Sequence, residues 1–79
     1  MLIKPNPATE MIEVVLKDNS KDFNEIIIID NLGRLIKELH VNNSINSISV
    51  DLSGIKSGMY FIQLKNDKGF FITGKFVKQ

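Results

Sequence analysis

The sequence predicts an all-β fold, a small Ig-like antiparallel β-sandwich of six or seven strands. Apolar and polar residues alternate with a period of two in several segments, which is typical of strands with one buried face. β-branched residues are frequent in these segments, and clusters of Asn, Asp, Ser and Gly separate them at intervals of roughly 8 to 12 residues. A chain of 79 residues has room for one domain, so we expect a single unit over residues 1–79, with 1–10 leading in from an upstream segment.

The strongest strand signal is the run of four isoleucines at 26–29. Isoleucine is stiff at χ1 and favours a strand, and apolar residues on both faces indicate a central strand with Ile26 and Ile28 toward the core. We expect strands at 11–17, 25–30, 35–41, 47–52, 59–65 and 70–78, with a seventh at 1–4 if that segment pairs. The alternating apolar positions that share one face of their strand are Ile12, Val14, Leu16, Ile48, Val50, Leu52, Tyr60, Ile62 and Leu64.

Two hairpin turns are predicted between strands. Asn31–Arg34 is expected to turn with Gly33 at positive φ, and Asn66–Gly69 forms the second turn signal. Further turns or loops are expected at 18–22, 42–44 and 53–58. A helix over 32–39 is an alternative reading of the apolar spacing there, but Gly33 lies inside it and so short a helix is marginal by itself.

Composition excludes several classes of function. Ten basic and nine acidic residues give a net charge of +1, which offers no electrostatic basis for binding nucleic acid or an anionic membrane. The chain has no cysteine for disulfides or thiolate metal sites, and its single histidine, His40, cannot build a multi-histidine site. No apolar run approaches the roughly 20 residues of a membrane helix. The first residues lack the pattern of a signal peptide, and we interpret them as an internal part of a longer chain.

The remaining polar residues indicate no catalytic centre, so we expect a protein without enzymatic activity, cofactor, metal or small-molecule substrate. Most carboxylates lie in or beside predicted turns, where short polar side chains cap backbone amides. No serine lies in a G-x-S-x-G motif, and the two hairpin turns lack the carboxylate spacing of a calcium loop. Asn42-Asn43-Ser44 matches the N-glycosylation triplet, and we interpret it as a loop. We expect His40 to be a surface residue at a strand end. We expect a structural role for the carboxylates of Glu10, Glu13, Asp18, Asp22, Asp30 and Asp67.

Phe61, Phe70 and Phe71 have two interpretations. They could form an exposed stacking platform for sugars on one sheet face. A small sandwich also needs aromatic residues in its core, and we favour the core for all three.

Taken together, the chain resembles the Por secretion system C-terminal sorting domain, the signal of type IX secretion, from Ile3 to Lys78. The motifs that carry the resemblance are, in chain order, Pro5-Asn6-Pro7-Ala8-Thr9-Glu10, Asp30 with Gly33-Arg34, Val50-Asp51-Leu52-Ser53, Ser57-Gly58-Met59-Tyr60 and Lys75-Phe76-Val77-Lys78. They are similar to the family's P-N-P-A-x-[DE], D-x-x-G-[KR], I-D-[LV]-S, S-G-x-Y and K-x-x-K. Lys4 replaces the usual aromatic residue and Ile55 the usual leucine.

The resemblance implies a secretion signal for an upstream cargo domain in the same chain. It implies passage through the periplasm of a Gram-negative bacterium, binding by an outer-membrane translocon and shuttle proteins, and removal by a cell-surface sortase-like peptidase upstream of Pro5-Asn6-Pro7. The cargo is then secreted or held at the cell surface. We expect Pro5, Asn6, Pro7, Asp30 and Gly33 to be structural, with the two prolines forming a stiff segment that cannot extend a sheet.

We further hypothesise that the last two strands carry the surface that the translocon recognises. An edge strand there could pair with a receptor strand, and lysines could meet carboxylates. The candidate residues are Gly58, Tyr60, Lys75, Phe76, Val77 and Lys78. Tyr60 is expected to pack its ring in the core and direct its hydroxyl to a backbone partner. The alternative function is an Ig-like or fibronectin-like accessory domain that binds polysaccharide or cell-surface partners.

Overall fold

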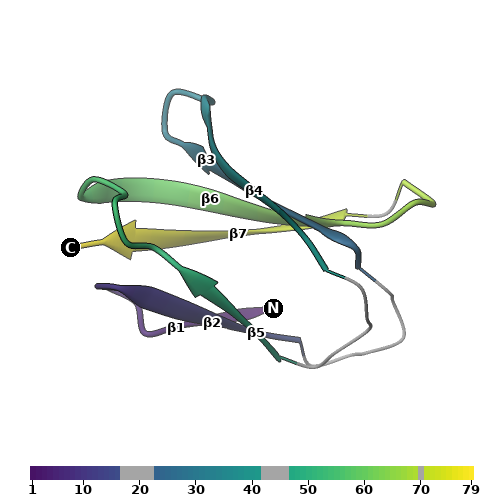
Figure 1. Cartoon of the computed structure of the whole chain (residues 1–79), viewed down its shortest axis with the longest axis horizontal. Helices are drawn as coiled ribbons and strands as arrows, with labels where there is room; N and C mark the ends of the chain where they lie inside the picture. Colours follow the sequence, from purple (N-terminus) through teal and green to yellow (C-terminus); the bar gives the residue numbers. More distant parts are fainter. Residues whose placement is uncertain (17–22, 42–46, 70) are drawn as a thin grey trace.

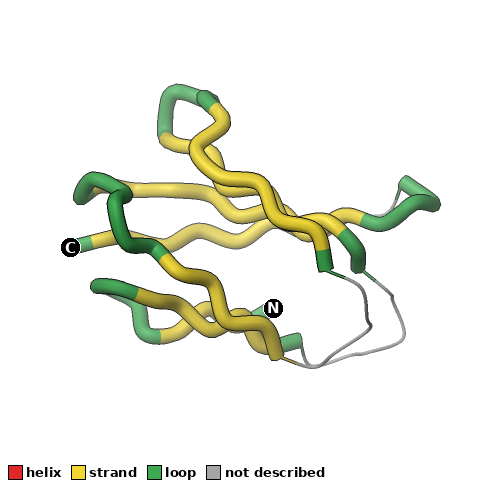
Figure 2. Tube along the Cα trace, viewed as in Figure 1, coloured by secondary structure: helices red, strands yellow, loops and turns green. Residues whose placement is uncertain are grey.

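The computed structural model describes residues 1–16, 23–41, 47–69 and 71–79, which form two antiparallel sheets facing each other (Figures 1 and 2). The strands are β1 (Leu2–Lys4), β2 (Met11–Val15), β3 (Glu25–Asp30), β4 (Leu35–His40), β5 (Ser47–Asp51), β6 (Gly58–Lys65) and β7 (Phe71–Lys78). One sheet has the order β1-β2-β5 and the other β4-β3-β6-β7. The predicted all-β sandwich is confirmed, including its seventh strand.

The described part of the chain contains no helix, and therefore none that could span a membrane. The helical alternative for 32–39 is wrong, because this segment completes a turn and then forms β4. The first long strand, β2, ends two residues before the predicted limit of 17. Leu16 is nevertheless buried beyond the strand end, and Lys17 lies outside the described residues, as do the predicted loops at 18–22 and 42–44.

The isoleucine run forms the centre of the larger sheet, as predicted. β3 pairs with β4 on one side and with β6 on the other. Ile26 and Ile28 are almost fully buried, whereas Ile27 and Ile29 on the opposite face are half-buried. A central strand buried on both faces needs apolar residues at every position, and this requirement explains the unbroken run.

The core lies between the sheets and is built from alternate residues of each strand. The predicted inward-facing residues of β2, β5 and β6 are all buried. The core consists of Ala8, Ile12, Val14, Leu16, Phe23, Ile26, Ile28, Ile48, Val50, Leu52, Tyr60, Ile62, Leu64 and Phe76. Burial of each large aliphatic side chain contributes about 1.5 to 3 kcal/mol, so this set is the main stabilising element of a domain without disulfides.

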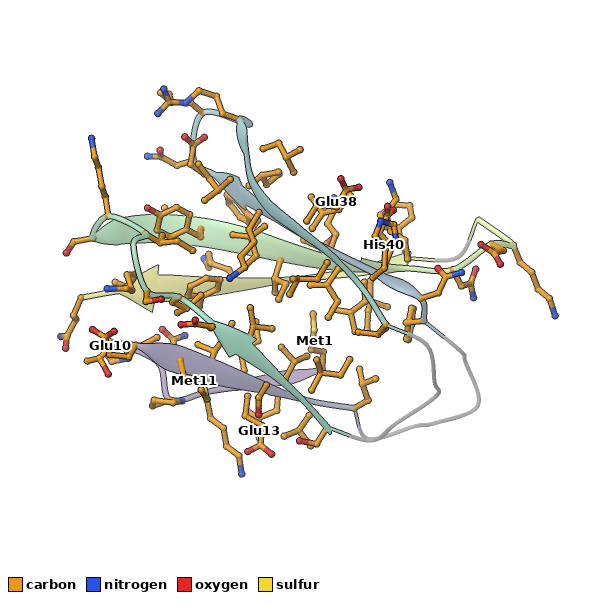
Figure 3. The ribbon with its side chains drawn as sticks, viewed as in Figure 1. Met1, Glu10, Met11, Glu13, Glu38 and His40 are labelled. Carbon is orange, nitrogen blue, oxygen red and sulfur yellow. The ribbon has the colours of Figure 1, made fainter. Side chains whose placement is uncertain are left out.

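The two sides of the sandwich are closed differently. On one side β1 covers β7 at Gly74, where a Cβ atom would come within 2.7 Å of the ends of Ile3 and Met1, so only glycine fits without a shift. Met1 points from β1 into the space between the sheets (Figure 3). On the other side the Lys37 ammonium of β4 donates to the Asp51 carbonyl of β5 at 2.6 Å.

The pairing of β4 with β3 contains a β-bulge between Ile28 and Ile29. Ile28 pairs with Lys37 and Ile29 with Leu35, so Ile36 is the extra residue. β4 is an edge strand, and its residues Leu35 and Ile36 are exposed. The bulge therefore leaves apolar side chains uncovered at this end of the sheet.

The prediction for the aromatic residues is partly wrong. Phe71 is 56% exposed, and Phe61 is half-buried on the outer face of the larger sheet, so neither lies in the core. Phe70 lies outside the described residues. The aromatic residues of the core are Phe23, Tyr60 and Phe76. In β7 both faces carry apolar residues, so its pairing register with β6, and not its sequence pattern, decides which phenylalanine points inward.

Candidate recognition surface

The last strand is tied to the proline-containing segment near the start of the chain. The Ala8 amide donates to the Val77 carbonyl at 2.7 Å, and the Gln79 amide donates to the Ala8 carbonyl at 2.7 Å. The Val77 amide donates to Oδ1 of Asn6 at 3.0 Å. Residues 6–8 thus cover the free edge of β7 at 77–79, and we call this arrangement the N-terminal clamp.

Pro5 and Pro7 take no part in a sheet, and the segment pairs with β7 only through Ala8, which follows them. Pro5 and Pro7 lack amide donors, but Ala8 has one, and it forms a parallel bridge with Lys78. Ala8 is fully buried, because it lies in the core beside this bridge. The segment is therefore part of the fold at its last residues, and the Asn6 side chain supplies an acceptor beyond the bridge.

Replacing Asn6 with alanine is expected to loosen the clamp. The Val77 amide would lose its acceptor, which costs about 0.5 to 1.5 kcal/mol in the free energy of unfolding. We expect faster hydrogen exchange at the Val77 amide, measured by NMR, and a slightly lower midpoint in urea. Thr9→Ala, at an exposed neighbouring position, is the control. Unchanged exchange at Val77 in Asn6→Ala would contradict the clamp.

Two of the six candidate recognition residues lie in the interior. The rings of Tyr60 and Phe76 stack with centroids 5.7 Å apart and an interplanar angle of 24°. The Tyr60 hydroxyl donates to the Lys56 carbonyl at 2.5 Å, as its predicted role requires. Phe76 is fully buried. These side chains shape the β6–β7 pair from inside and cannot contact a partner while the domain is folded.

The other four candidates lie at the paired ends of β6 and β7. Gly58 begins β6 opposite Lys78 and is exposed, with φ of +153°. The Lys78 side chain is largely buried, and its ammonium donates to the Gln79 carbonyl at 3.0 Å. Lys75 and Val77 are exposed on the outer face. Of the six, Gly58, Lys75 and Val77 are thus available for direct contact.

The structure places further apolar residues beside Lys75 and Val77. Met59 pairs with Val77, Phe61 pairs with Lys75, and Ile29 pairs with Phe61. Leu35 lies across from Ile29 on the edge strand β4. We call this set the outer apolar face; its residues are Ile29, Leu35, Met59, Phe61 and Val77, with Lys75 among them. Ile29, Leu35, Met59 and Phe61 were not predicted as recognition residues, although the apolar residues on both faces of β3 were a signal for Ile29.

Asp30 holds the turn between β3 and β4. Its carboxylate accepts hydrogen bonds from the Leu32 amide at 2.9 Å, the Arg34 amide at 2.9 Å and the Arg34 Nε at 2.7 Å. Gly33 donates its amide to the Asp30 carbonyl and has φ of +84°, a conformation that side chains with a Cβ rarely adopt. The motif D-x-x-G-R is therefore a self-contained turn, in which the aspartate satisfies the donors that the turn exposes.

This turn makes a prediction for acid stability. The hydrogen bond from the Arg34 amide, with further hydrogen bonds and the Arg34 charge, lowers the pKa of Asp30 below its ordinary 3.8 despite the opposing effect of burial. A lowered pKa in the folded state means that the stabilisation by Asp30 is complete above 3.8 and is lost as the pH falls through the folded pKa. In denaturation series from about pH 6 to pH 2, Asp30→Asn should lose less stability than wild type. Parallel losses would contradict this role.

Three other carboxylates, those of Asp51, Asp67 and Glu13, have hydrogen-bond or ion-pair partners within the fold. Asp51 accepts from the Ser53 amide at 2.9 Å, which chiefly lowers its pKa, and thereby ends β5 in a turn. Asp67 accepts from the Asn24 side chain at 2.7 Å. Glu13 forms an ion pair with Lys4 at 3.8 Å and accepts from the Ser47 hydroxyl. Asp18 and Asp22 lie outside the described residues.

A comparison of the sequence with models of protein families gives a match. The sequence model of the secretion system C-terminal sorting domain matches residues 3–79. The chain belongs to this family. No curated protein matches it. The motifs of the resemblance have these places in the structure: N-P-A forms the clamp, D-x-x-G-R the β3–β4 turn and D-L-S the end of β5, and G-x-Y and K-x-x-K lie on the paired strands β6 and β7.

Membership of this family gives the domain its general role. It is a C-terminal sorting signal of the type IX, or Por, secretion system, and the family is a sorting signal and not a catalytic one. Such a signal implies a secretion system that reads it and an upstream cargo that is exported to the cell surface or the medium.

Proposed function

We propose that this domain is a folded tag that an outer-membrane translocon grasps while it carries an upstream cargo out of the periplasm of a Gram-negative bacterium. The observation that supports this most is the N-terminal clamp. It joins residues 6–8, within the leading segment 1–10, to the last three residues of the chain. A cargo attached before residue 1 would thus be connected mechanically to the strand pair that we propose is recognised.

We propose that the translocon recognises the outer apolar face and not the free edge of β7. At 77–79 the backbone groups of that edge are already bonded to Asn6 and Ala8, so strand addition there would first have to displace the clamp. The outer apolar face needs no such opening. It offers exposed Met59 and Val77 beside the Lys75 charge, which suits a partner surface with apolar residues and a carboxylate.

Removal by a cell-surface sortase-like peptidase is part of the proposal, and the fold constrains where the cut lies. Leu2, Ile3 and Lys4 pair with β2, so the peptide bonds of β1 are held in a sheet. Proteolysis favours exposed, unpaired backbone. We therefore place the cleavage point upstream of Leu2, before the first strand.

The direct experiment fuses residues 1–79 to a periplasmic reporter in a host with the secretion system and then deletes residues 74–79. Export should fall to the level of the unfused reporter. Because this deletion also removes the core residue Phe76, the surface variant Lys75→Glu/Val77→Ser is measured in parallel. Undiminished export of both variants would refute recognition by β6 and β7.

The alternative, a polysaccharide-binding module, has one observation in its favour, the exposed ring of Phe71. The pairing register separates it from Phe61, because Gln63 and Thr73 lie between them on the two strands. The two rings therefore do not adjoin to form one stacking platform. Glycan binding that Phe71→Ala abolishes, with export unchanged, would favour the module over the tag.

A further inference from the structure

Three metal-binding side chains lie together on the outer face of the larger sheet, at the end away from the β3–β4 turn. They are Glu25 of β3 and Glu38 and His40 of β4. Glu25 pairs directly with His40, and Glu38 is two residues before His40, so all three project from the same face. One potential ligand atom from each lies within 4.8 Å of the others. Figure 3 shows Glu38 and His40 side by side above β4.

In the described part of the chain, neither carboxylate of this group has an ion-pair partner within 4 Å, although Lys65 of β6 pairs with Glu25 in the sheet. Among the described residues the ion pairs within 4 Å are Lys4–Glu13 and Arg34–Asp30, so neither Glu25 nor Glu38 has a side-chain cation at that distance. Two carboxylates and a neutral imidazole carry a charge of −2, which a divalent cation would balance.

A hollow of about 370 Å³ lies directly beside the group and is lined by Glu25, His40 and Lys65 together with the oxygen-bearing side chains of Asn24, Asn66 and Asp67. It leaves room for water on the open side of a bound ion. The site thus provides three protein ligands and space for a fourth ligand.

We propose that Glu25, Glu38 and His40 form a binding site for Zn²⁺. An imidazole with two carboxylates suits zinc, which binds N and O ligands at about 2.0 to 2.2 Å in a tetrahedral arrangement. Calcium takes six to eight oxygen ligands, more than this group supplies. The side chains are exposed or half-buried and their ligand atoms already lie within 4.8 Å of one another, so binding requires that they move closer around the ion.

Bound Zn²⁺ would fasten the edge strand β4 to β3. Among the described residues β4 pairs in the sheet with β3 alone, and its last residue is His40. An ion that bridges Glu25 to Glu38 and His40 would hold the open end of this hairpin, at the opposite end from the Asp30 turn. Because it binds the folded state, Zn²⁺ would raise the unfolding temperature of the domain.

The test uses the 79-residue chain titrated with Zn²⁺ and, in parallel, with Ca²⁺. His40 is the sole histidine, so its imidazole signals in ¹H NMR report the site without ambiguity. We expect these signals to shift to saturation at one equivalent of Zn²⁺ and not with Ca²⁺, and the unfolding temperature to rise with Zn²⁺. His40→Ala and Glu38→Gln should each weaken binding by more than about tenfold, a loss that removal of an outer-shell partner alone can reach.

Two further variants sharpen the test. Lys65 pairs with Glu25 from β6 and lines the same hollow, so Lys65→Gln should tighten Zn²⁺ binding. Glu10→Gln, an exposed carboxylate at a distant position, should leave it unchanged. Affinity that is equal in wild type and His40→Ala, or a wild-type response to Zn²⁺ no greater than to Ca²⁺, would overturn the site. Neither result bears on the sorting function, which the export assay measures separately.

Discussion

Phe76→Ala is expected to bring the domain close to unfolding. The Phe76 ring is fully buried and stacks on Tyr60, so its removal leaves a cavity between the sheets. Loss of a buried phenylalanine costs about 3 to 5 kcal/mol. A chain of 79 residues has a total stability of roughly 4 to 12 kcal/mol at the usual value per residue. One substitution thus removes a large share of the free energy of unfolding.

Urea denaturation followed by circular dichroism measures this effect, and Phe71→Ala provides the matched control. Phe71 lies on the same strand but is 56% exposed, so its truncation should change stability by about 0.5 kcal/mol or less. Equal midpoints for the two variants would mean that the register of β7 against β6 is incorrect, because that register alone decides which ring points inward.

Lys75→Glu combined with Val77→Ser is expected to reduce export of a fused reporter by at least about tenfold without unfolding the domain. Both side chains are exposed on the outer apolar face, so the folded structure does not depend on them. The double substitution reverses the charge and removes an apolar contact at the proposed docking surface. Truncation of a hot-spot residue near the centre of an interface costs about 2 kcal/mol or more, which is consistent with a loss of this size if either residue is such a hot spot.

The control is Lys68→Glu, which makes the same charge change in the exposed turn at the other end of the β6–β7 hairpin. It should be exported as well as wild type. Thermal unfolding of each purified variant verifies that the fold is intact. If the double variant is exported normally while Lys68→Glu is not, the recognised surface lies at the opposite end of these strands.

The strands and most inward-facing residues could be predicted because their signals are local. A period of two in β2, β5 and β6 assigns one face of each strand to the core, and the isoleucine run marks β3 as central. In β7 the same reasoning fails. Phe71 and Phe76 lie at positions of opposite parity, and no local pattern selects between them. The choice depends on pairing with β6, where Tyr60 meets Phe76.

The sequence indicated which strands carry the candidate recognition surface, but it did not indicate how their residues are arranged in space. The clamp joins Asn6 to Val77, 71 residues apart, and the prolines beside Asn6 argued locally against any sheet there. Similarly, the proposed zinc ligands come from two strands, and Glu25 meets His40 only through the β3–β4 register. Contacts of this kind follow from the order of strands in the sheet, which the alternation of apolar residues does not specify.

The most direct measurement of the central claim compares a reporter fused to residues 1–79 in two otherwise identical hosts, one with the type IX system and one without it. We predict that the fusion protein appears outside the cell only in the first host, and that the reporter without the domain stays in the periplasm of both. Release of the fusion protein from the host that lacks the system, or its retention in the periplasm of the host that has it, would contradict the account.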